Sequence, residues 1–275
     1  MTTIFSARDQ GAGIRRLPGP NLRIGPTSVP IFRVLALGGV GLGVLIGIAQ
    51  SVRLGASPWT ALAVGTFGAV GSLLVMIFRA YRGSSDWVWH EHELVVLVVA
   101  GAVGIWVGRP LAVLDVTVTA LLVILAVGRI GCLLAGCCHG REVKSSGWAV
   151  HYGPTHVCGG LPPQLIGVPL APIQLFESAG ALVLAVGALT IPGLPPGAVL
   201  VAGLGARATL RIVLESYRGD RRRPDGLGLS TPQGWAVAMA VCLLLASAAS
   251  AVPVGPWTAI PLLTGVALVG RLHRS

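Results

Sequence analysis

The sequence predicts an all-α, polytopic membrane protein with seven transmembrane helices, or eight if the short run 256–271 also crosses, and a small extramembrane cap. Composition is the first reason, because 53% of the 275 residues are hydrophobic and only 11% are charged. A soluble domain of this length carries about 25% charged residues. The second reason is that the apolar residues fall in runs of about 20, the length at which a helix crosses a bilayer.

The apolar runs give the candidate spans in order along the chain. Stretches such as Gly38–Gly43 place several glycines inside a run, which predicts helices that pack closely through small residues. The expected spans are 31–52, 58–78, 88–108, 111–134, 173–191, 196–217 and 234–252.

Three polar segments complete the predicted organisation. Residues 1–30 combine arginines and prolines without an apolar core, so we expect a flexible basic tail. The membrane domain is expected over 31–252. It is interrupted at 139–171 by an insert rich in glycine and proline, which we interpret as the extramembrane cap. Residues 253–275 hold the weak last span and a tail.

The net charge of +10 does not indicate nucleic-acid binding. The arginines lie mostly at the ends of apolar runs, and no basic stripe alternates with aromatic residues. Anionic lipid headgroups are therefore the expected counter-charge, and membrane lipids the expected partners.

Ionisable residues inside the apolar runs mark a candidate site. Arg129 lies at the end of the run 111–134, where a charge costs about 2.5–3.5 kcal/mol to insert and is usually functional. Arg207, Arg211 and Glu215 are spaced i, i+4, i+8, so they share one helix face, with Arg218 close by. Such a stripe predicts a cationic slot for a phosphate, because the guanidinium fork matches phosphate oxygens. The alternative is a set of internal Arg–Glu pairs that only fixes helix packing.

Two further segments carry candidate site residues near the ends of spans. Gln174 and Glu177 project together at the start of one span. Glu177 is either an acid that the helix dipole stabilises at the N-terminus, or a carboxylate that orients an arginine or accepts a proton. His90 lies at the start of another span, and histidine suits general-base chemistry near neutral pH.

Cys132, Cys137, Cys138 and His139 form a thiol-rich cluster after the run 111–134. Vicinal cysteines have poor geometry for a single tetrahedral metal site, and no CxxC pair is present. Small polarizable residues around a glycine-rich turn are one interpretation. A non-catalytic membrane protein that senses metals or thiols through this cluster is the other.

These motifs together resemble the prolipoprotein diacylglyceryl transferases, integral membrane enzymes of bacteria. The family pattern Gly-Arg-x-Gly-Asn-Phe-x-Asn-Gly-Glu-x-x-Gly-Arg is similar to the segment 128–141, and further blocks follow in the family's order. Matching residues of that segment are Gly128, Arg129, Gly131, Gly136, Gly140 and Arg141; the other similar blocks are Trp89-His90, Pro172–Glu177, Arg211–Glu215 with Arg218, and Leu229–Gln233. The chain departs from the pattern at Cys132 and Cys137, where the family has asparagine and glutamate.

The resemblance implies a transfer reaction in the bacterial cytoplasmic (inner) membrane, without a metal or organic cofactor. The diacylglyceryl group of phosphatidylglycerol would move to the thiol of a lipobox cysteine in a prolipoprotein, releasing glycerol 1-phosphate. The implied catalytic residues are His90 as the base, Arg129 and Arg211 at the phosphate, and Glu215. The implied substrate-binding residues are Arg129, Gly131, Gly140, Arg141, Gln174, Glu177, Arg207 and Arg218.

Two points stay open at the level of sequence. The positive-inside rule places the insert 139–171 in the cytoplasm, whereas the family orientation places it outside, and we follow the family because site arginines bias the charge count. The replaced positions Cys132 and Cys137 also admit an enzyme of the same fold that acts on another acceptor, such as a small thiol or a different lipid.

Overall fold

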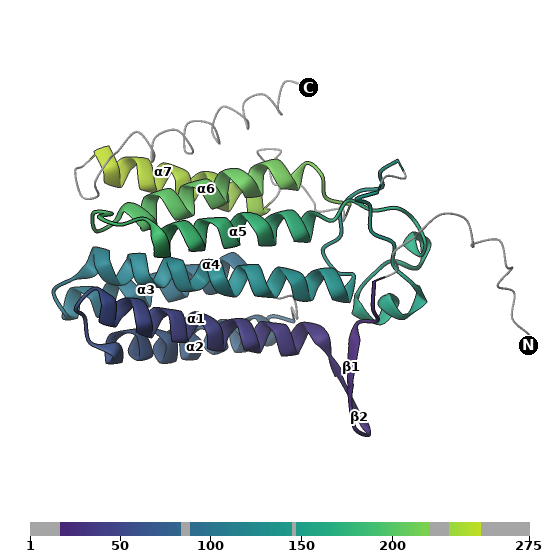
Figure 1. Ribbon diagram of the computed structural model, residues 1–275, viewed down its shortest axis with the longest axis horizontal. Helices are drawn as coiled ribbons and strands as arrows, with labels where there is room; N and C mark the ends of the chain where they lie inside the picture. The colour runs from purple at the N-terminus through teal and green to yellow at the C-terminus, as the bar shows by residue number, and fades with distance from the viewer. Residues whose placement is uncertain (1–16, 84–88, 145–146, 220–230, 249–275) are drawn as a thin grey trace, which may run out of the picture.

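The computed structural model describes residues 17–83, 89–144, 147–219 and 231–248. Within these ranges the chain forms seven α-helices and one β-hairpin. The helices lie roughly along one common axis (Figure 1). They are α1 (Ile31–Arg53), α2 (Pro58–Tyr81), α3 (Trp89–Trp106), α4 (Pro110–Ala135), α5 (Ile173–Thr190), α6 (Ala198–Glu215) and α7 (Thr231–Ala248).

Each of the seven apolar runs expected within 31–252 therefore forms a helix. By length and composition, α1, α2, α4 and α5 qualify as membrane spans among the described residues. Helix α6 carries three charged side chains and α3 begins with two acids, which lowers their apolar character. The expected eighth span at 256–271 lies outside the described residues.

Short turns with specific start and stop residues connect the helices. Proline occupies the first position of α2 and of α4, where its missing N–H costs no hydrogen bond. Ser57 caps α2 by accepting a hydrogen bond from the backbone N–H of Trp59 at 3.3 Å. Gly136 ends α4 in the left-handed conformation, with φ of 81°.

Helix α4 is the centre of the bundle and packs against α1, α3, α5 and α6. Val118 and Leu122 of α4 are almost fully buried in a core that also contains Val201 and Leu204 of α6. A Cβ placed on Gly203 of α6 would lie 3.1 Å from Val118, so the small residue allows the close approach of α4 and α6.

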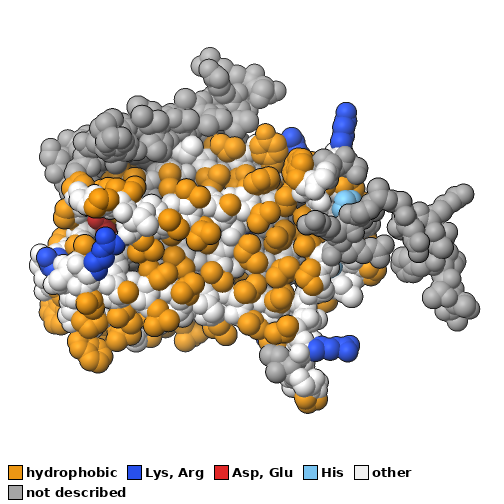
Figure 2. Space-filling model, viewed as in Figure 1, with side chains coloured by type: hydrophobic (Ala, Val, Ile, Leu, Met, Phe, Trp, Pro, Cys, Tyr) orange, Lys and Arg blue, Asp and Glu red, His pale blue; other side chains and the backbone are white. Residues whose placement is uncertain are grey.

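The sides of the bundle are apolar. In Figure 2 hydrophobic side chains cover the described flank of the helices, while Lys and Arg side chains lie toward the two ends. The exposed apolar residues of the helices include Leu37 and Val183, with relative exposures of 73% and 71%. An apolar belt between two polar ends is the surface that a bilayer requires.

Residues 21–30 form regular structure at one end of the bundle. Strands β1 (Asn21–Ile24) and β2 (Thr27–Pro30) form an antiparallel hairpin, in contrast to the flexible tail expected over 1–30. Gly25 supplies the positive φ of 59° that the tight turn needs, and sequence composition alone did not reveal this pairing. Residues 1–16 lie outside the described ranges.

The insert 139–171 forms a small irregular cap with short 3₁₀ turns at Pro154–Gly159 and Pro163–Leu165. Its own apolar core consists of Tyr152, Leu161 and Leu170, which are at most 2% exposed. His156 joins the cap to the segment before the hairpin, because its Nε2 lies 3.1 Å from the Pro18 carbonyl.

Candidate active site

Ionisable side chains from four helices, α3, α4, α5 and α6, gather at the end of the bundle that carries the cap. Helices α4 and α6 end there, and α3, α5 and α7 begin there (Figure 1). Because the helices alternate in direction, residues far apart in the sequence meet at this end. Apart from Arg141, which lies in the cap, the charged site residues expected from the sequence lie on these helices or directly after them.

Glu177 is the centre of the buried charge network. Its Oε2 lies 3.0 Å from Nε of Arg129 in α4 and 3.3 Å from Nη1 of Arg211 in α6. The Glu177 side chain is 5% exposed and the two arginine side chains are 11% exposed. One carboxylate from α5 therefore holds two guanidinium groups from two other helices.

Four more charged residues extend this network. Arg211 also contacts Glu215 through Nη2 at 2.8 Å, and Nε of Arg218 lies 3.8 Å from the same carboxylate. Arg207, closer to the middle of α6, pairs with Glu93 of α3. The sequence had not assigned a role to Glu93, although an acid near the start of an apolar run was a signal for one.

The network has an excess of positive charge. Among the described residues it contains four guanidinium groups and three carboxylates, which leaves one net positive charge in a buried region. The pairs offset much of the cost of burying each ion. The remaining charge suits an anion such as a phosphodiester, because guanidinium donors match phosphate oxygens.

His90 lies at the same end, at the start of α3. Its imidazole ring packs on the indole of Trp235 in α7, with ring centroids 5.1 Å apart and an interplanar angle of 33°. This aromatic contact orients the imidazole ring between α3 and α7. His90 is half-buried.

Three residues expected to bind substrate make other contacts. Gly131 faces α1, where an added Cβ would lie 3.3 Å from Phe32. Gly140 pairs with Arg218 in an isolated β-bridge and packs on Ala171. Arg141 is exposed, and its guanidinium carbon lies 4.8 Å from the centre of the Tyr217 ring. The structure does not place these three residues in contact with the carboxylates of the charge network. Gly131 packs α4 on α1, whereas Gly140 and Arg141 contact the segment that follows α6.

Gln174, also expected to bind substrate, connects α5 to the segment after α4. Its Nε2 donates hydrogen bonds to the Cys137 carbonyl at 2.8 Å and to the Tyr152 hydroxyl at 3.4 Å. Burial raises the pKa of the Tyr152 hydroxyl above its usual value, so this group stays neutral. The side chain of Gln174 is thus a support for the cysteine segment.

The three cysteines of the segment 128–141, hereafter the signature segment, lie together. The Sγ atoms of Cys132, Cys137 and Cys138 are all within 4.8 Å of one another. Hydrogen bonds from Cys132 and Cys137, together with the charges of Arg129 and Arg218, hold the pKa of the Cys138 thiol well below its usual value. The sequence analysis expected poor metal-site geometry from vicinal cysteines, whereas the turn that follows α4 brings the three sulfurs together.

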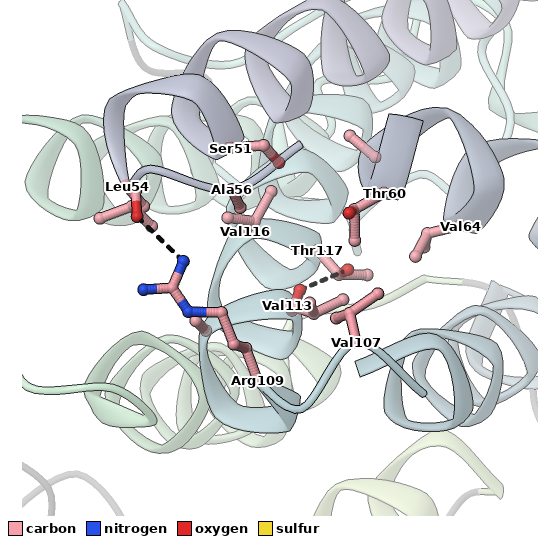
Figure 3. Close-up of a pocket in the computed structure, with 12 residues that line it drawn as sticks. Ser51, Leu54, Ala56, Thr60, Val64, Val107, Arg109, Val113, Val116 and Thr117 are labelled. Atoms are coloured by element: carbon pink, nitrogen blue, oxygen red, sulfur yellow. Dashed lines mark hydrogen bonds between the residues drawn. The ribbon is translucent and has the colours of Figure 1, made fainter. Parts of the chain in front are cut away.

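A pocket at the opposite end of the bundle has a different character. Figure 3 shows it between the α1–α2 and α3–α4 connections, with a lining of mainly apolar side chains such as Val64 and Val113. Arg109 points toward the Leu54 carbonyl, which accepts a hydrogen bond from its Nη1 at 3.3 Å. None of the expected site residues lines this pocket.

The fold and the site define a helical membrane protein with a buried cluster of arginines and glutamates at one end of its bundle. Residues 22–252 match the family model for prolipoprotein diacylglyceryl transferase, and the chain belongs to this family.

Two curated relatives agree with this assignment. The chain is 39% identical over 89 residues to phosphatidylglycerol--prolipoprotein diacylglyceryl transferase 2 of Clostridium perfringens (strain 13 / Type A), which covers 30% of this chain and 31% of the relative. It is 35% identical over 86 residues to phosphatidylglycerol--prolipoprotein diacylglyceryl transferase of Dehalococcoides mccartyi (strain ATCC BAA-2266 / KCTC 15142 / 195), over 29% of this chain and 31% of the relative. The chain thus spans about a third of the length of each of these relatives.

Proposed function

We propose that the protein transfers the diacylglyceryl group of phosphatidylglycerol to the thiol of a lipobox cysteine in prolipoproteins. It would act in the bacterial cytoplasmic membrane with α1–α7 as seven spans and the cap on the outer side. Family membership and the names of the two relatives support the reaction. The apolar flank of the bundle supports the location.

The observation that carries the proposal is the sharing of Glu177 between Arg129 and Arg211. Pairing that served packing alone needs one carboxylate for each guanidinium, as Arg207 and Glu93 provide. Here three cations, Arg129, Arg211 and Arg218, face two anions, Glu177 and Glu215, and a phosphodiester supplies the missing negative charge.

The two arginines have different free capacity for a phosphate. Arg211 contacts Glu177 through Nη1 and Glu215 through Nη2, so carboxylates occupy both ends of its fork. Arg129 contacts Glu177 through Nε, which is one of the five N–H donors of a guanidinium. Arg129 is therefore the main phosphate contact in this proposal, and Arg211 holds Glu177 in place while adding positive field.

The reaction then proceeds by displacement at the glyceryl carbon. The acceptor sulfur forms the new C–S bond at the glyceryl carbon. The bond between that carbon and the phosphate ester oxygen breaks, and glycerol 1-phosphate leaves with the bonding electrons. The leaving phosphate gains charge, which Arg129 stabilises as it develops. His90 is the proposed acceptor of the thiol proton, because the thiolate is the reactive form.

Complementation tests this function. The full chain is expressed in a bacterium depleted of its own transferase, and a reporter prolipoprotein is followed by gel mobility. We expect wild type to restore lipidation, and Arg129→Ala to lower it by about 10²–10³-fold, the usual loss for one electrostatic stabiliser.

Arg109→Ala is the matched control, because Arg109 lies at the opposite end and bonds only backbone carbonyls of Leu54 and Gly55 in the described contacts. Full lipidation by this variant separates the site from general effects of removing an arginine. Failure of the inserted wild type to lipidate the reporter would overturn the proposal. Consumption of labelled phosphatidylglycerol without a change in the reporter would identify a different acceptor.

A further inference from the structure

The cysteine cluster lies directly beside the proposed phosphate site. Cys132 follows Arg129 by three residues in α4, so the two side chains share a helix face one turn apart. The three Sγ atoms of Cys132, Cys137 and Cys138 lie within 4.8 Å of one another. Cys132 is 8% exposed, and Cys137 and Cys138 are partly buried.

A strained turn brings the sulfurs together. Gly136 has φ of 81° and Cys138 has φ of 54°, and Cys138 is the one non-glycine residue with positive φ among the described residues. A left-handed conformation is unfavourable for a residue with a Cβ. In extended backbone the side chains of Cys137 and Cys138 would diverge, and this turn places both sulfurs on the side of Cys132.

Gln174 provides an independent indication of a ligand. The residue is 1% exposed, and its Nε2 is fixed on the Cys137 carbonyl at 2.8 Å. Its Oε1 is buried without a hydrogen-bond partner among the described residues. A buried amide oxygen without a donor is costly, and an acceptor thiol that arrives beside the cysteines with its proton would supply the missing donor.

We propose that Cys132, Cys137 and Cys138 bind a zinc ion as three thiolates and leave its fourth position open for the acceptor thiol. Three protein ligands and one exchangeable position are the pattern of catalytic zinc sites. Zn–S bonds of about 2.3 Å in a tetrahedron place the sulfurs about 3.8 Å apart, a small closure of the observed group. His139 is outside the group, and its Nδ1 lies 3.0 Å from the Gly140 carbonyl.

The charges of the two neighbouring sites complement each other. A zinc ion with three thiolates carries one net negative charge, and the arginine network carries one net positive charge. Arg129 and Arg218 both act electrostatically on the cysteines. This arrangement would hold the anionic metal site and the phosphate site side by side, as a thiol-to-lipid displacement requires.

The zinc would supply the deprotonated nucleophile. The acceptor thiol loses its proton to His90 or water when its sulfur binds the metal, since a coordinated thiol is deprotonated. The sulfur lone pair then forms the C–S bond to the glyceryl carbon, the C–O bond breaks, and the phosphate leaves with the electron pair. No oxidant or reductant takes part, and the thioether product leaves the fourth position.

The identity of the acceptor in this inference rests on the proposed function. The binding of the metal does not depend on that function. The expectation that no metal is needed came from a family pattern with asparagine and glutamate at two of these positions. Thiols occupy them here, so that expectation does not carry over.

The test uses the full chain, purified in detergent under reducing conditions and analysed for metals by mass spectrometry. We expect about one zinc per chain. We expect Co²⁺ loaded in place of zinc to give thiolate-to-metal charge-transfer absorption and tetrahedral d–d bands. A lipobox peptide should shift the d–d bands, and the same peptide with serine in place of the cysteine should not.

Cysteine variants locate the site. We expect Cys132→Ser and Cys138→Ser each to weaken zinc binding by at least about 10-fold. Cys158→Ser is the matched control, because Cys158 is exposed in the cap and lies outside the group. Wild-type protein without metal, or a cobalt spectrum without thiolate bands, would overturn the site even if a variant failed to fold.

The two proposals fail in different ways. Lipidation of the reporter by a protein that holds no metal leaves the transferase function and removes the zinc site. A thiolate-bound metal in a protein that lipidates nothing leaves the site and removes the transferase function.

Discussion

The two ends of the bundle place buried polar side chains in different kinds of contact. At the end away from the cap, Asp115 of α4 accepts hydrogen bonds from the backbone N–H groups of Gly197 and Leu200, at 2.6 and 2.7 Å. These are the first N–H groups of α6, so Asp115 caps that helix from a neighbouring one. At the cap end, Arg129, Glu177 and Arg211 contact one another.

This difference separates stabilising from functional polar groups. A side chain that satisfies backbone groups has a complete partner set, and nothing remains for a ligand. A cluster of charges from three helices with an unbalanced positive charge has capacity for an anion. The comparison therefore predicts that substitutions at the far end change stability alone, whereas substitutions at the cap end change activity.

The largest expected effect is that of Glu177→Gln. This change keeps the side-chain shape but removes the charge that Arg129 and Arg211 share, and breaking a buried ion pair costs about 3–5 kcal/mol. We expect loss of lipidation and a lower unfolding temperature in detergent. Added phosphatidylglycerol should raise that temperature more in the variant than in wild type, because its phosphate replaces the lost charge.

Glu142→Gln is the control for this substitution, since Glu142 is an exposed acid of the cap. It should leave both the unfolding temperature and lipidation unchanged. Equal responses of wild type and Glu177→Gln to phosphatidylglycerol would argue against an anion site at Glu177.

His90→Gln is expected to have the next largest effect. If the imidazole accepts the proton of the acceptor thiol, its loss should slow transfer by about 10²–10⁴-fold. The pH–rate profile should also lose its acidic limb, which a purely structural role against Trp235 would not change. Transfer measured from pH 5 to 9 checks both expectations, with His151→Gln in the cap as the control.

Asp115→Ala tests the far end of the bundle. Two backbone N–H groups of α6 lose a charged acceptor, and hydrogen bonds to charged groups contribute about 1.5–3 kcal/mol each. We expect a lower unfolding temperature but unchanged lipidation per folded molecule, measured against the amount of protein in the membrane. A specific loss of activity at full expression would break the distinction between the two ends.

The sequence predicted the helices well because span length and hydropathy are local properties. All seven apolar runs expected within 31–252 form helices, and the first and last residues of each helix differ from the expected ones by a few residues. The hairpin at 21–30 was missed because its order depends on backbone pairing and on contact with the cap, such as that of Leu17 with the Tyr152 cluster. Such contacts between distant segments leave no periodic pattern.

The site could be predicted only in part, because spacing along one helix is visible in the sequence and contacts between helices are not. Arg207, Arg211 and Glu215 shared a helix face by spacing alone, but their partners Glu93 and Glu177 belong to other helices. Nothing in the sequence indicated that Asp115 caps α6, because its partners are backbone groups of residues far along the chain. The convergence of Cys132, Cys137 and Cys138 depended on a positive φ that is rare outside glycine.

The smallest expected effects come from two glycines of the signature segment, Gly131 and Gly128. A Cβ on Gly131 would lie 3.3 Å from Phe32 and 3.4 Å from Leu35, so Gly131→Ala presses α4 against α1. A Cβ on Gly128 would meet nothing within 4 Å. Gly128→Ala should therefore gain about 0.5–1 kcal/mol of helix stability, while Gly131→Ala should lose stability despite the same helical preference.

Unfolding temperatures of the two variants in one detergent check this pair, and lipidation sharpens it. If Gly131 serves packing, as its contacts indicate, activity should fall only as far as the amount of folded protein falls. A stable Gly131→Ala protein without lipidation would instead place substrate against this helix face and would move the boundary of the site toward α1.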